Sequence, residues 1–294
     1  MKAKKILMAG LFTVLLCGTA MANGQQDAGS GSEWPKKAIQ IICPFAPGGD
    51  TDFNARSYTE GLKKALGVDV VIVSTEGNGG ATGARKAKDV SPDGYSVFFG
   101  SSAFLTNELS GAIDFGLEAF EMSCVAGENP GLVICVRKEL GVKNLKELVN
   151  YTAANPGRLR MAANTGATTQ IVALMLKNIG VNANIVDAGD SGGRIVALLG
   201  GHVDIIINAY GSIKDYVASG DFVALGIPSD TQPKLVPDIP TCISQGYNVV
   251  FPSYYFFAFP KGTDKVIVDK FTAAVGDIAK NDSAYAKTIA DAYS

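Results

Sequence analysis

The feature that most constrains the fold is a repeated alternation of short, unbroken apolar runs with segments of helical periodicity. The apolar runs are residues 38–45, 69–74, 95–100, 160–164, 182–188, 203–208, 222–228 and 254–259. Unbroken runs rich in Val, Ile and Phe between helices predict parallel strands with both faces covered. We therefore expect an α/β fold built on parallel sheets.

Helical segments are expected between these runs. The first is predicted as one helix that places Phe53, Tyr58 and Leu62 along one side, with Gly67 as its stop. The segment at residues 144–154 begins with an asparagine and has a glutamate three positions later, which is the pattern of a capping box. Further helices are expected at residues 80–90, 168–180 and 192–201.

The start of the sequence has the pattern of a secretory signal peptide. A basic stretch precedes an apolar run at residues 6–16, and an A-x-A cleavage site ends at Ala22. The run is shorter than the about 18 apolar residues that a membrane-spanning helix needs. Because Leu16 is bulky where lipoprotein signals prefer a small residue before the cysteine, here Cys17, we expect cleavage after Ala22 without lipid and a periplasmic protein. Residues 23–32 are polar and predict a flexible tether.

Charge and cysteine content exclude several functions. The 294 residues suffice for two domains, and a net charge of −2 without a basic stripe disfavours nucleic acid as a partner. With one histidine, and cysteines whose spacing fits no metal pattern, we expect no metal and no cofactor. Cys124 and Cys135 lie in neighbouring apolar runs. Either a disulfide across a hairpin or buried free thiols would fit them, and we favour free thiols.

Residues 189–193 read GDSGG, the sequence around the nucleophile of chymotrypsin-like serine proteases. A serine attacks only when a base takes its proton, and in those enzymes the histidine precedes the serine along the chain. The one histidine here, His202, follows Ser191 and is expected at the surface. We therefore expect neither a nucleophilic serine nor an enzyme.

Four turns that follow predicted strands have unusual compositions. They are PFAPGGDTD at 44–52, EGNGGATGA at 76–84, NTGATTQ at 164–170 and DAGDSGGR at 187–194. Ligands of open α/β sheets bind at such strand-to-helix turns. The turns present backbone N–H groups and small hydroxyls at helix starts, where the helix dipole favours an anion. These groups favour binding of an anion over catalysis, because they include no evident acid–base pair.

Several longer motifs occur in register along residues 34–271. They are Trp-Pro before IQIICPFAPGGDTDFNAR, GNGGATGA followed by SPDGYSVFF, LKELVNYTAANPGRLRMAANTGA, VALLGGHVD, and PDIPTCISQGY followed by YFFAFPKGT. Together they resemble the extracytoplasmic solute receptors of tripartite tricarboxylate transporters, the TctC or Bug family. The resemblance implies a type II periplasmic-binding-protein fold, with two α/β domains joined by a two-strand hinge and a ligand cleft between them.

The resemblance also implies domain boundaries and a function. Residues 33–132 and 251–294 are expected to form domain 1 and residues 133–250 domain 2, with hinge strands near 132–136 and 254–259. The implied function is capture of a small carboxylate, either a di- or tricarboxylate or an acidic amino acid. A monomer would deliver it to membrane permease subunits. The alternative is a sensing receptor of the same fold that feeds a membrane signalling partner.

In the family, two turns hold the ligand carboxylate. Carried over to this sequence, they map to Pro47, Gly48, Gly49, Thr51 and Asp52 in the first turn and to Gly166, Ala167 and Gln170 in the third. Asp52 is also placed to cap the following helix. Ala167 and Gln170 replace the family's usual serine and histidine, and Thr168 is expected to restore a hydroxyl nearby.

The fourth turn adds Asp190 and Ser191 as candidate ligand residues, which would either contact a ligand or cap a helix. A bare carboxylate about 4 Å from an anionic ligand would repel it by about 4 kcal/mol at an effective dielectric of 20. Asp187 and Asp190 therefore either pair with Arg194 or cap the helix, or one of them meets a positive group on the ligand. The second option would make the ligand a zwitterion.

Overall fold

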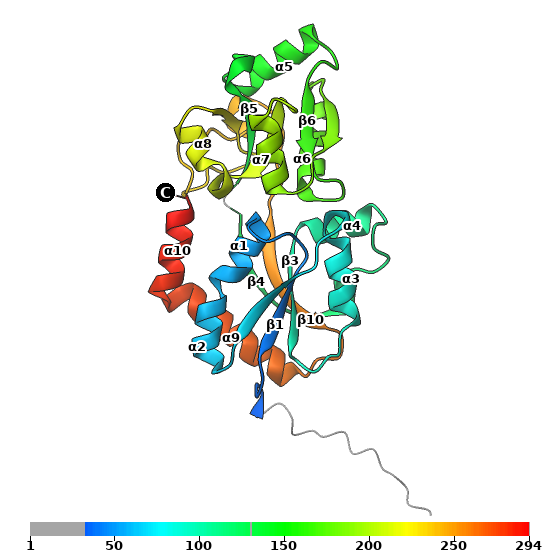
Figure 1. Ribbon diagram of the computed structural model, residues 1–294, viewed down its shortest axis with the longest axis vertical. Helices are drawn as coiled ribbons and strands as arrows, with labels where there is room; N and C mark the ends of the chain where they lie inside the picture. The colour runs from blue at the N-terminus through cyan, green and yellow to red at the C-terminus, as the bar shows by residue number, and fades with distance from the viewer. Residues whose placement is uncertain (1–32, 130, 294) are drawn as a thin grey trace, which may run out of the picture. The chain divides into compact units, whose positions relative to one another are not determined.

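The structure is a computed structural model that describes residues 33–129 and 131–293. These residues form two five-stranded sheets, each with helices packed against it (Figure 1). The predicted signal peptide and tether, residues 1–32, lie outside the described residues. Within the described ranges, none of the helices combines the length and the apolar character that crossing a bilayer requires.

The first sheet has the strand order β2-β1-β3-β10-β4. Its strands are β1 (Ile39–Cys43), β2 (Val70–Ser74), β3 (Ser96–Ser101), β4 (Phe120–Glu128) and β10 (Tyr254–Pro260). β1 pairs in parallel with β2 and β3, whereas β10 runs antiparallel to β3 and β4.

The second sheet has the strand order β7-β6-β8-β5-β9. Its strands are β5 (Leu132–Arg137), β6 (Arg160–Ala163), β7 (Asn184–Asp187), β8 (Ile205–Ala209) and β9 (Phe222–Gly226). β6 is parallel to β7 and β8, whereas β5 is antiparallel to β8 and β9.

The expectation of purely parallel sheets was therefore wrong. Each sheet contains one strand, β10 or β5, that runs against its neighbours. An unbroken apolar run reports burial on both faces, and a central antiparallel strand shares that property with a parallel one. β2 was expected to be buried, but it is the edge strand of its sheet and is partly exposed.

The helices follow most of the predicted segments. They are α1 (Asp50–Ser57), α2 (Thr59–Leu66), α3 (Ala81–Asp89), α4 (Ala103–Leu109), α5 (Leu145–Ala154), α6 (Thr168–Asn178), α7 (Ser191–Leu199), α8 (Lys214–Ala218), α9 (Lys265–Asn281) and α10 (Ser283–Tyr293). The N-cap half of the capping box is confirmed, because the Asn144 side chain accepts from the Glu147 N–H at 2.9 Å; the Glu147 carboxylate accepts from the Lys143 N–H instead of the Asn144 N–H.

The first predicted helix is broken in two at Tyr58. The hydroxyls of Ser57 and Thr59 donate to the carbonyls of Asn54 and Arg56 at 2.7 and 2.8 Å. A side-chain hydroxyl that donates to a backbone carbonyl in this way competes with the backbone N–H groups that bond to the same carbonyls in a regular helix. The Tyr58 N–H accordingly bonds to Ala55 in a tighter turn.

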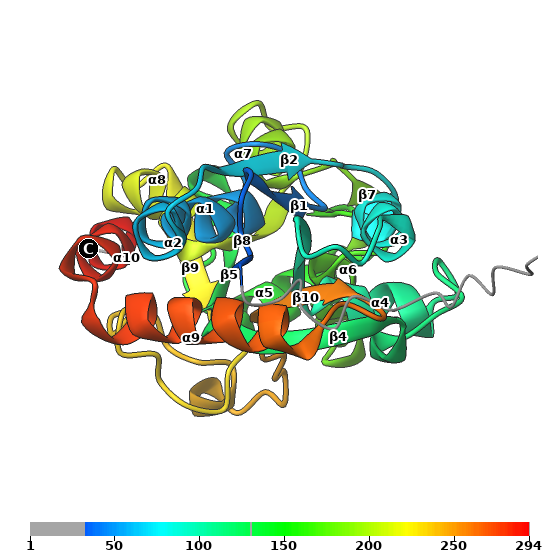
Figure 2. The same ribbon diagram turned by 90° about the horizontal axis from the view of Figure 1, so that it is seen from below.

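The core of the first sheet is aromatic. Figure 2 shows α9 running along the side of this sheet where β4 and β10 lie. Phe271 of α9 packs edge-on against Phe257 and Phe259 of β10, and all three are fully buried. The α9 backbone is therefore fixed to the sheet by large apolar contacts.

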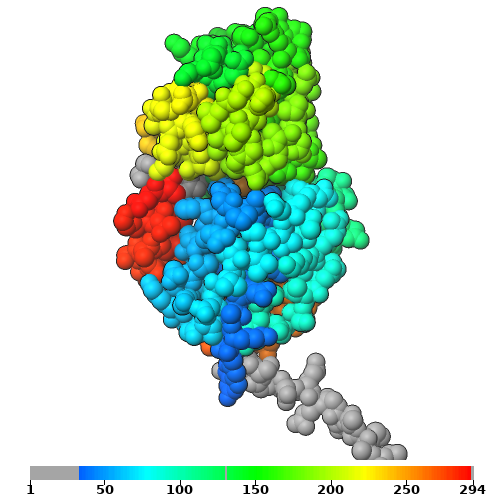
Figure 3. Space-filling view, viewed as in Figure 1, coloured from blue at the N-terminus to red at the C-terminus, as the bar shows by residue number. Residues whose placement is uncertain are grey.

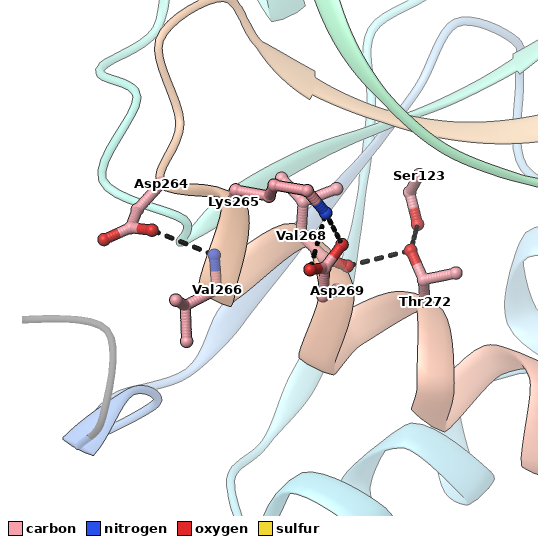
Figure 4. Close-up of polar contacts among 7 residues, drawn as sticks. All are labelled: Ser123, Asp264, Lys265, Val266, Val268, Asp269 and Thr272. Atoms are coloured by element: carbon pink, nitrogen blue, oxygen red, sulfur yellow. Dashed lines mark hydrogen bonds and ion pairs between the residues drawn. The ribbon is translucent and has the colours of Figure 1, made fainter.

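The first turns of α9 are held by polar contacts (Figure 4). The Asp264 side chain accepts from the Val266 N–H at 2.9 Å, and Lys265 pairs with Asp269 at 2.7 Å. Further along, the Thr272 hydroxyl donates to the Val268 carbonyl and lies 2.7 Å from the Ser123 hydroxyl of β4.

We predict that Asp264→Ala lowers the free energy of unfolding by about 0.5–2 kcal/mol, because the mutation removes an N-cap acceptor. Asp269→Ala is the matched control, since it removes only an exposed ion pair that contributes little. Urea unfolding of both variants measures the difference. Equal destabilisation by the two substitutions would contradict a capping role for Asp264.

The last helix, α10, contacts residues of both sheets' cores. The Tyr285 hydroxyl donates to the Tyr58 hydroxyl at 2.9 Å beside the first sheet, whereas Ile289 and Ala292 pack against the core of the second. In Figure 3 this helix, in red, lies beside both the part of the molecule that contains the first sheet and the part that contains the second. α10 thus joins the two sheets outside their strands.

The four described cysteines are free. Cys124 lies on β4 of the first sheet and Cys135 on β5 of the second, so the two do not face each other across a hairpin. The disulfide alternative was therefore wrong, and the thiols favoured from the sequence are present.

Candidate functional site

The main candidate site is a cavity lined by residues that follow strands of both sheets. Its wall includes Gly49, Asp50 and Thr51 at the start of α1, Ala167, Thr168 and Thr169 at the start of α6, and Asp190, Ser191 and Arg194 at the start of α7. The cavity volume is about 70 Å³.

Three helix N-termini meet at this cavity, those of α1, α6 and α7. The N–H groups of Thr51, Thr168 and Ser191 have no acceptor among the described residues. Helix N-termini carry partial positive charge and free donors, and a carboxylate there is typically stabilised by 0.3–1 kcal/mol per helix end. The local geometry of the cavity therefore favours an anion over a cation beside these three helix ends.

Arg194 is the cationic side chain of the described cavity wall, and only 6% of it is exposed. Its Nε donates to Asn208 Oδ1 and its Nη1 donates to the Gly189 carbonyl, both at 2.8 Å. Its Nη2 donates to no described residue. Burial lowers the pKa of Arg194 to about 10, against the raising effect of nearby Asp190, Asp187 and Asp50, so the side chain is charged at neutral pH.

Asn208 links Arg194 to the serine of the GDSGG motif. Its Nδ2 donates to the Ser191 hydroxyl at 2.8 Å and to the Ser191 carbonyl at 3.1 Å. The Ser191 hydroxyl in turn donates to the Ser212 hydroxyl at 3.1 Å. The proton of the Ser191 hydroxyl therefore points to a neutral hydroxyl and not to a base. His202 is exposed, as expected. This geometry does not supply a base for nucleophilic attack.

Asp50, which the sequence analysis had passed over, also lines the cavity. Its Oδ2 accepts from Asn129 Nδ2 at 2.9 Å and from the Tyr255 hydroxyl, and both donors are cavity residues. Burial raises the pKa of Asp50 above its ordinary value, against the lowering effects of the bonds from Tyr255 and Asn129 and of the Arg194 charge.

The two aspartates of the fourth turn are occupied by backbone donors. The Asp190 side chain accepts from the Gly193 N–H at 2.9 Å and is the N-cap of α7. Asp187 accepts from the Thr165 N–H at 3.0 Å and the Gly189 N–H at 2.8 Å. Burial raises the pKa of Asp187, but these bonds and the charge of Arg194 hold it below its ordinary value. Of the two options, the capping role is the one that the geometry favours.

Comparison with known families decides what kind of protein carries this cavity. Residues 54–293 match the family model described as Tripartite tricarboxylate transporter family receptor. The chain belongs to the TctC family. Protein BugT of Bordetella pertussis is similar, with 30% identity over 246 residues that cover 81% of this chain and 75% of BugT.

Solved structures similar to this TctC-family chain include MatC and BugD, each at 25% identity or more. MatC from Rhodopseudomonas palustris, solved with bound malate, has 25% identity and a TM-score of 0.81, covering 88% of this chain and 90% of MatC. The periplasmic binding protein BugD has 26% identity and a TM-score of 0.75, covering 88% of each chain. These likenesses confirm the family predicted from the sequence and its two-domain periplasmic-binding-protein fold.

The sequence named eleven candidate ligand residues, eight of them from the TctC resemblance, and six of the eleven line the cavity. These six are Gly49, Thr51, Ala167, Thr168, Asp190 and Ser191. The other five, which lie outside the described wall, are Pro47, Gly48, Asp52, Gly166 and Gln170. Gln170 supports the third turn, because its Oε1 accepts from the Gly166 N–H at 2.8 Å. Ligand contact at each of these positions stays a prediction.

Asp52 does not cap α1 in the way that was expected. The N-cap position is Gly49, and the buried Asp52 carboxylate lies in the first helical turn. Its Oδ2 accepts from the Gly48 N–H at 2.9 Å and from Arg56 Nε at 2.7 Å. Asp52 thus reaches back along the chain to hold the glycine turn.

We predict that Asp52→Ala destabilises this family member by about 1–3 kcal/mol and weakens ligand binding. The substitution leaves the Gly48 N–H and Arg56 without their acceptor, which loosens the turn. Asp52→Asn is the control, since it keeps an acceptor for the Gly48 N–H. Thermal melting and ligand titration together test the prediction, which fails if Asp52→Ala matches the wild type in both.

The second predicted turn lines an adjoining cavity with the third and fourth turns. Gly79 and Gly80 share this cavity with Asn164 and Gly189. Gly79, at φ 62°, lies so close to the third turn that an added Cβ would be 2.6 Å from the Thr165 carbonyl oxygen. All four turns therefore meet at one cleft, as their positions after strands predicted. Among the described residues, no cluster of His, Cys, Asp and Glu could hold a metal ion.

Proposed function

We propose that this TctC-family chain is an extracytoplasmic receptor that captures a small carboxylate and delivers it to the permease subunits of a tripartite transporter. The observation that carries the proposal is the meeting of three helix N-termini with buried Arg194 at one cavity. Each of these groups stabilises negative charge. MatC, a similar protein, was solved with malate, which is a dicarboxylate.

The proposed mechanism is closure of two lobes around the ligand, each lobe being one sheet with its helices. The chain passes between the sheets at two adjacent places, where the Asn129 N–H donates to the Ser253 carbonyl at 2.8 Å. We place the hinge at these crossings, just before β5 and β10. Rotation there would open the cavity and release the ligand.

The cavity favours binding over turnover. Its described wall contains no histidine and no cysteine, and the Ser191 hydroxyl donates to another hydroxyl. Asp190 is held by a backbone N–H, so Asp50 has no free second carboxylate to share acid–base work. We therefore propose that the ligand leaves unchanged, that no cofactor takes part, and that the receptor acts as a monomer in the periplasm after signal-peptide removal.

A thermal-shift screen of mono-, di- and tricarboxylates and amino acids tests the proposed binding. A ligand at 100 times its dissociation constant stabilises the folded form by about 2.7 kcal/mol, which raises the melting temperature by several degrees. Uptake of the best ligand should be lost when the gene is deleted from its host. A thermal shift without an uptake defect would favour the sensing alternative, and a flat screen would contradict the receptor function.

A further inference from the structure

The charged groups of the cavity do not match a ligand that carries only negative charge. Among the described wall residues, the charged side chains are Asp50, Asp190 and Arg194. Asp190 is engaged by the Gly193 N–H as a helix cap. Asp50 differs, because its carboxylate accepts only from side chains and does not cap a helix through a backbone N–H.

Asp50 is held in place by neutral groups alone. Its Oδ2 accepts from Asn129 Nδ2 and the Tyr255 hydroxyl, and its Oδ1 makes only a 3.4 Å contact with Asn54 Nδ2. Within the described part of the chain, no lysine, arginine or histidine forms an ion pair with Asp50. Neutral donors orient a carboxylate without cancelling its charge, so Asp50 would repel a ligand carboxylate placed beside it.

Asp50 and Arg194 reach the cavity from different sheets. Asp50 begins α1, which packs on the first sheet, whereas Arg194 belongs to α7, which packs on the second. The Arg194 charge acts on Asp50 without a direct hydrogen bond between them. A ligand with a positive and a negative end can therefore satisfy both groups at once.

We propose that Asp50 binds a cationic nitrogen of the ligand, so that the solute is an amino acid. Its ammonium group faces Asp50, and its carboxylate faces Arg194 and the N-termini of α6 and α7. This inference rests on the proposed receptor function and narrows its ligand class. It also makes the ligand an electrostatic link between the two lobes, because each ligand charge pairs with a different lobe and both pairs form only when the lobes are closed.

Two matched ligand pairs isolate the ammonium group. L-aspartate differs from succinate, and L-alanine from propionate, only by the ammonium group that replaces a hydrogen. Calorimetric titration should show wild-type protein binding one amino acid at least about tenfold more tightly than its partner acid, as expected for a charge-assisted contact. Asp50→Asn should reduce that ratio by about tenfold or more, chiefly by weakening the amino acid.

Two further variants serve as controls. Asp187→Asn removes a negative charge near Arg194 that lies outside the cavity wall, and it should leave the ratio unchanged. Asp50→Glu keeps the charge and should restore most of the preference, which also guards against a folding defect in Asp50→Asn. Melting curves of each variant confirm that it is folded.

The outcomes separate this inference from the function on which it rests. Tight binding of succinate or propionate, with a ratio that Asp50→Asn does not change, overturns the role of Asp50 and leaves a carboxylate receptor standing. Failure of all four probes, together with a flat carboxylate and amino-acid screen, overturns the receptor function and the inference with it.

Discussion

Replacing Arg194 by methionine is expected to weaken ligand binding by about 100-fold or more, which corresponds to about 2.7 kcal/mol. The guanidinium is buried in the cavity wall, and its Nη2 donates to none of the described residues. A charge-assisted hydrogen bond to a carboxylate contributes about 1.5–3 kcal/mol, and its loss leaves the ligand carboxylate desolvated without a cation. Calorimetric titration measures the loss.

The same substitution removes two internal hydrogen bonds, so folding must be measured alongside. Asn208 and the Gly189 carbonyl lose their donor when Arg194 is replaced. Arg194→Lys retains the charge and should bind better than Arg194→Met, although it lacks the forked geometry of arginine. Arg85→Met is the control for charge, because Arg85 is exposed on α3 and lies outside the cavity wall. A change in Kd below about threefold for folded Arg194→Met would remove this residue from the site.

Gly79→Ala is expected to weaken ligand binding by about tenfold or more, because it obstructs the closed arrangement of the two lobes. An added Cβ would lie 2.6 Å from the backbone of Thr165 and Gly166, on the turn that leads into α6. Backbone cannot yield as a flexible side chain does, so the lobes must separate at this point. The prediction applies to ligand affinity and to the compactness of the liganded protein, which small-angle scattering reports.

Gly67→Ala separates the clash from the backbone strain. Gly67 ends α2 at φ 74° and an added Cβ there meets nothing within 4 Å. Both substitutions place alanine in the left-handed region, at a cost of about 1 kcal/mol to stability. Only Gly79→Ala should also lower affinity. Equal affinity of the two variants would show that the Gly79 contact does not limit closure.

The sequence predicted the strands of this fold better than their directions. Runs such as VDIIIN and YYFFAF signal burial, and the structure places β8 and β10 there. The direction of β10 depends on where the chain re-enters the first sheet after leaving the second, and no local pattern reports that path. α9 and α10 were not predicted, although Asp264 and Asp282 stand as acceptors before them.

The sequence predicted those candidate site residues whose backbone N–H groups and hydroxyls lie within a single turn. Glycine-containing turns before predicted helices indicated Gly49, Thr168 and Ser191 as candidate site residues, and this needed no knowledge of the tertiary structure. Asp50 was missed because an aspartate in a glycine turn resembles a helix cap, and its partners come from distant segments. Tyr255 stands 205 positions away in the chain.

Asn208 gave a signal that went unused. It is a polar residue at the end of an apolar strand, and it is fully buried in the structure. A buried amide needs partners for both its donor and its acceptor. Those partners are Arg194 and Ser191, so an asparagine at the end of an apolar strand was a usable sign of a buried polar network.

The most direct test of the account is a crystal structure of the protein with the best ligand from the thermal-shift screen. We predict ligand density in the cavity at the starts of α1, α6 and α7. The ligand carboxylate should form hydrogen bonds with Arg194 and with the Ser191 N–H. We also predict the cationic nitrogen of the ligand beside Asp50. A ligand seated outside this cavity, or one whose carboxylate contacts neither Arg194 nor a helix N-terminus, would contradict the account.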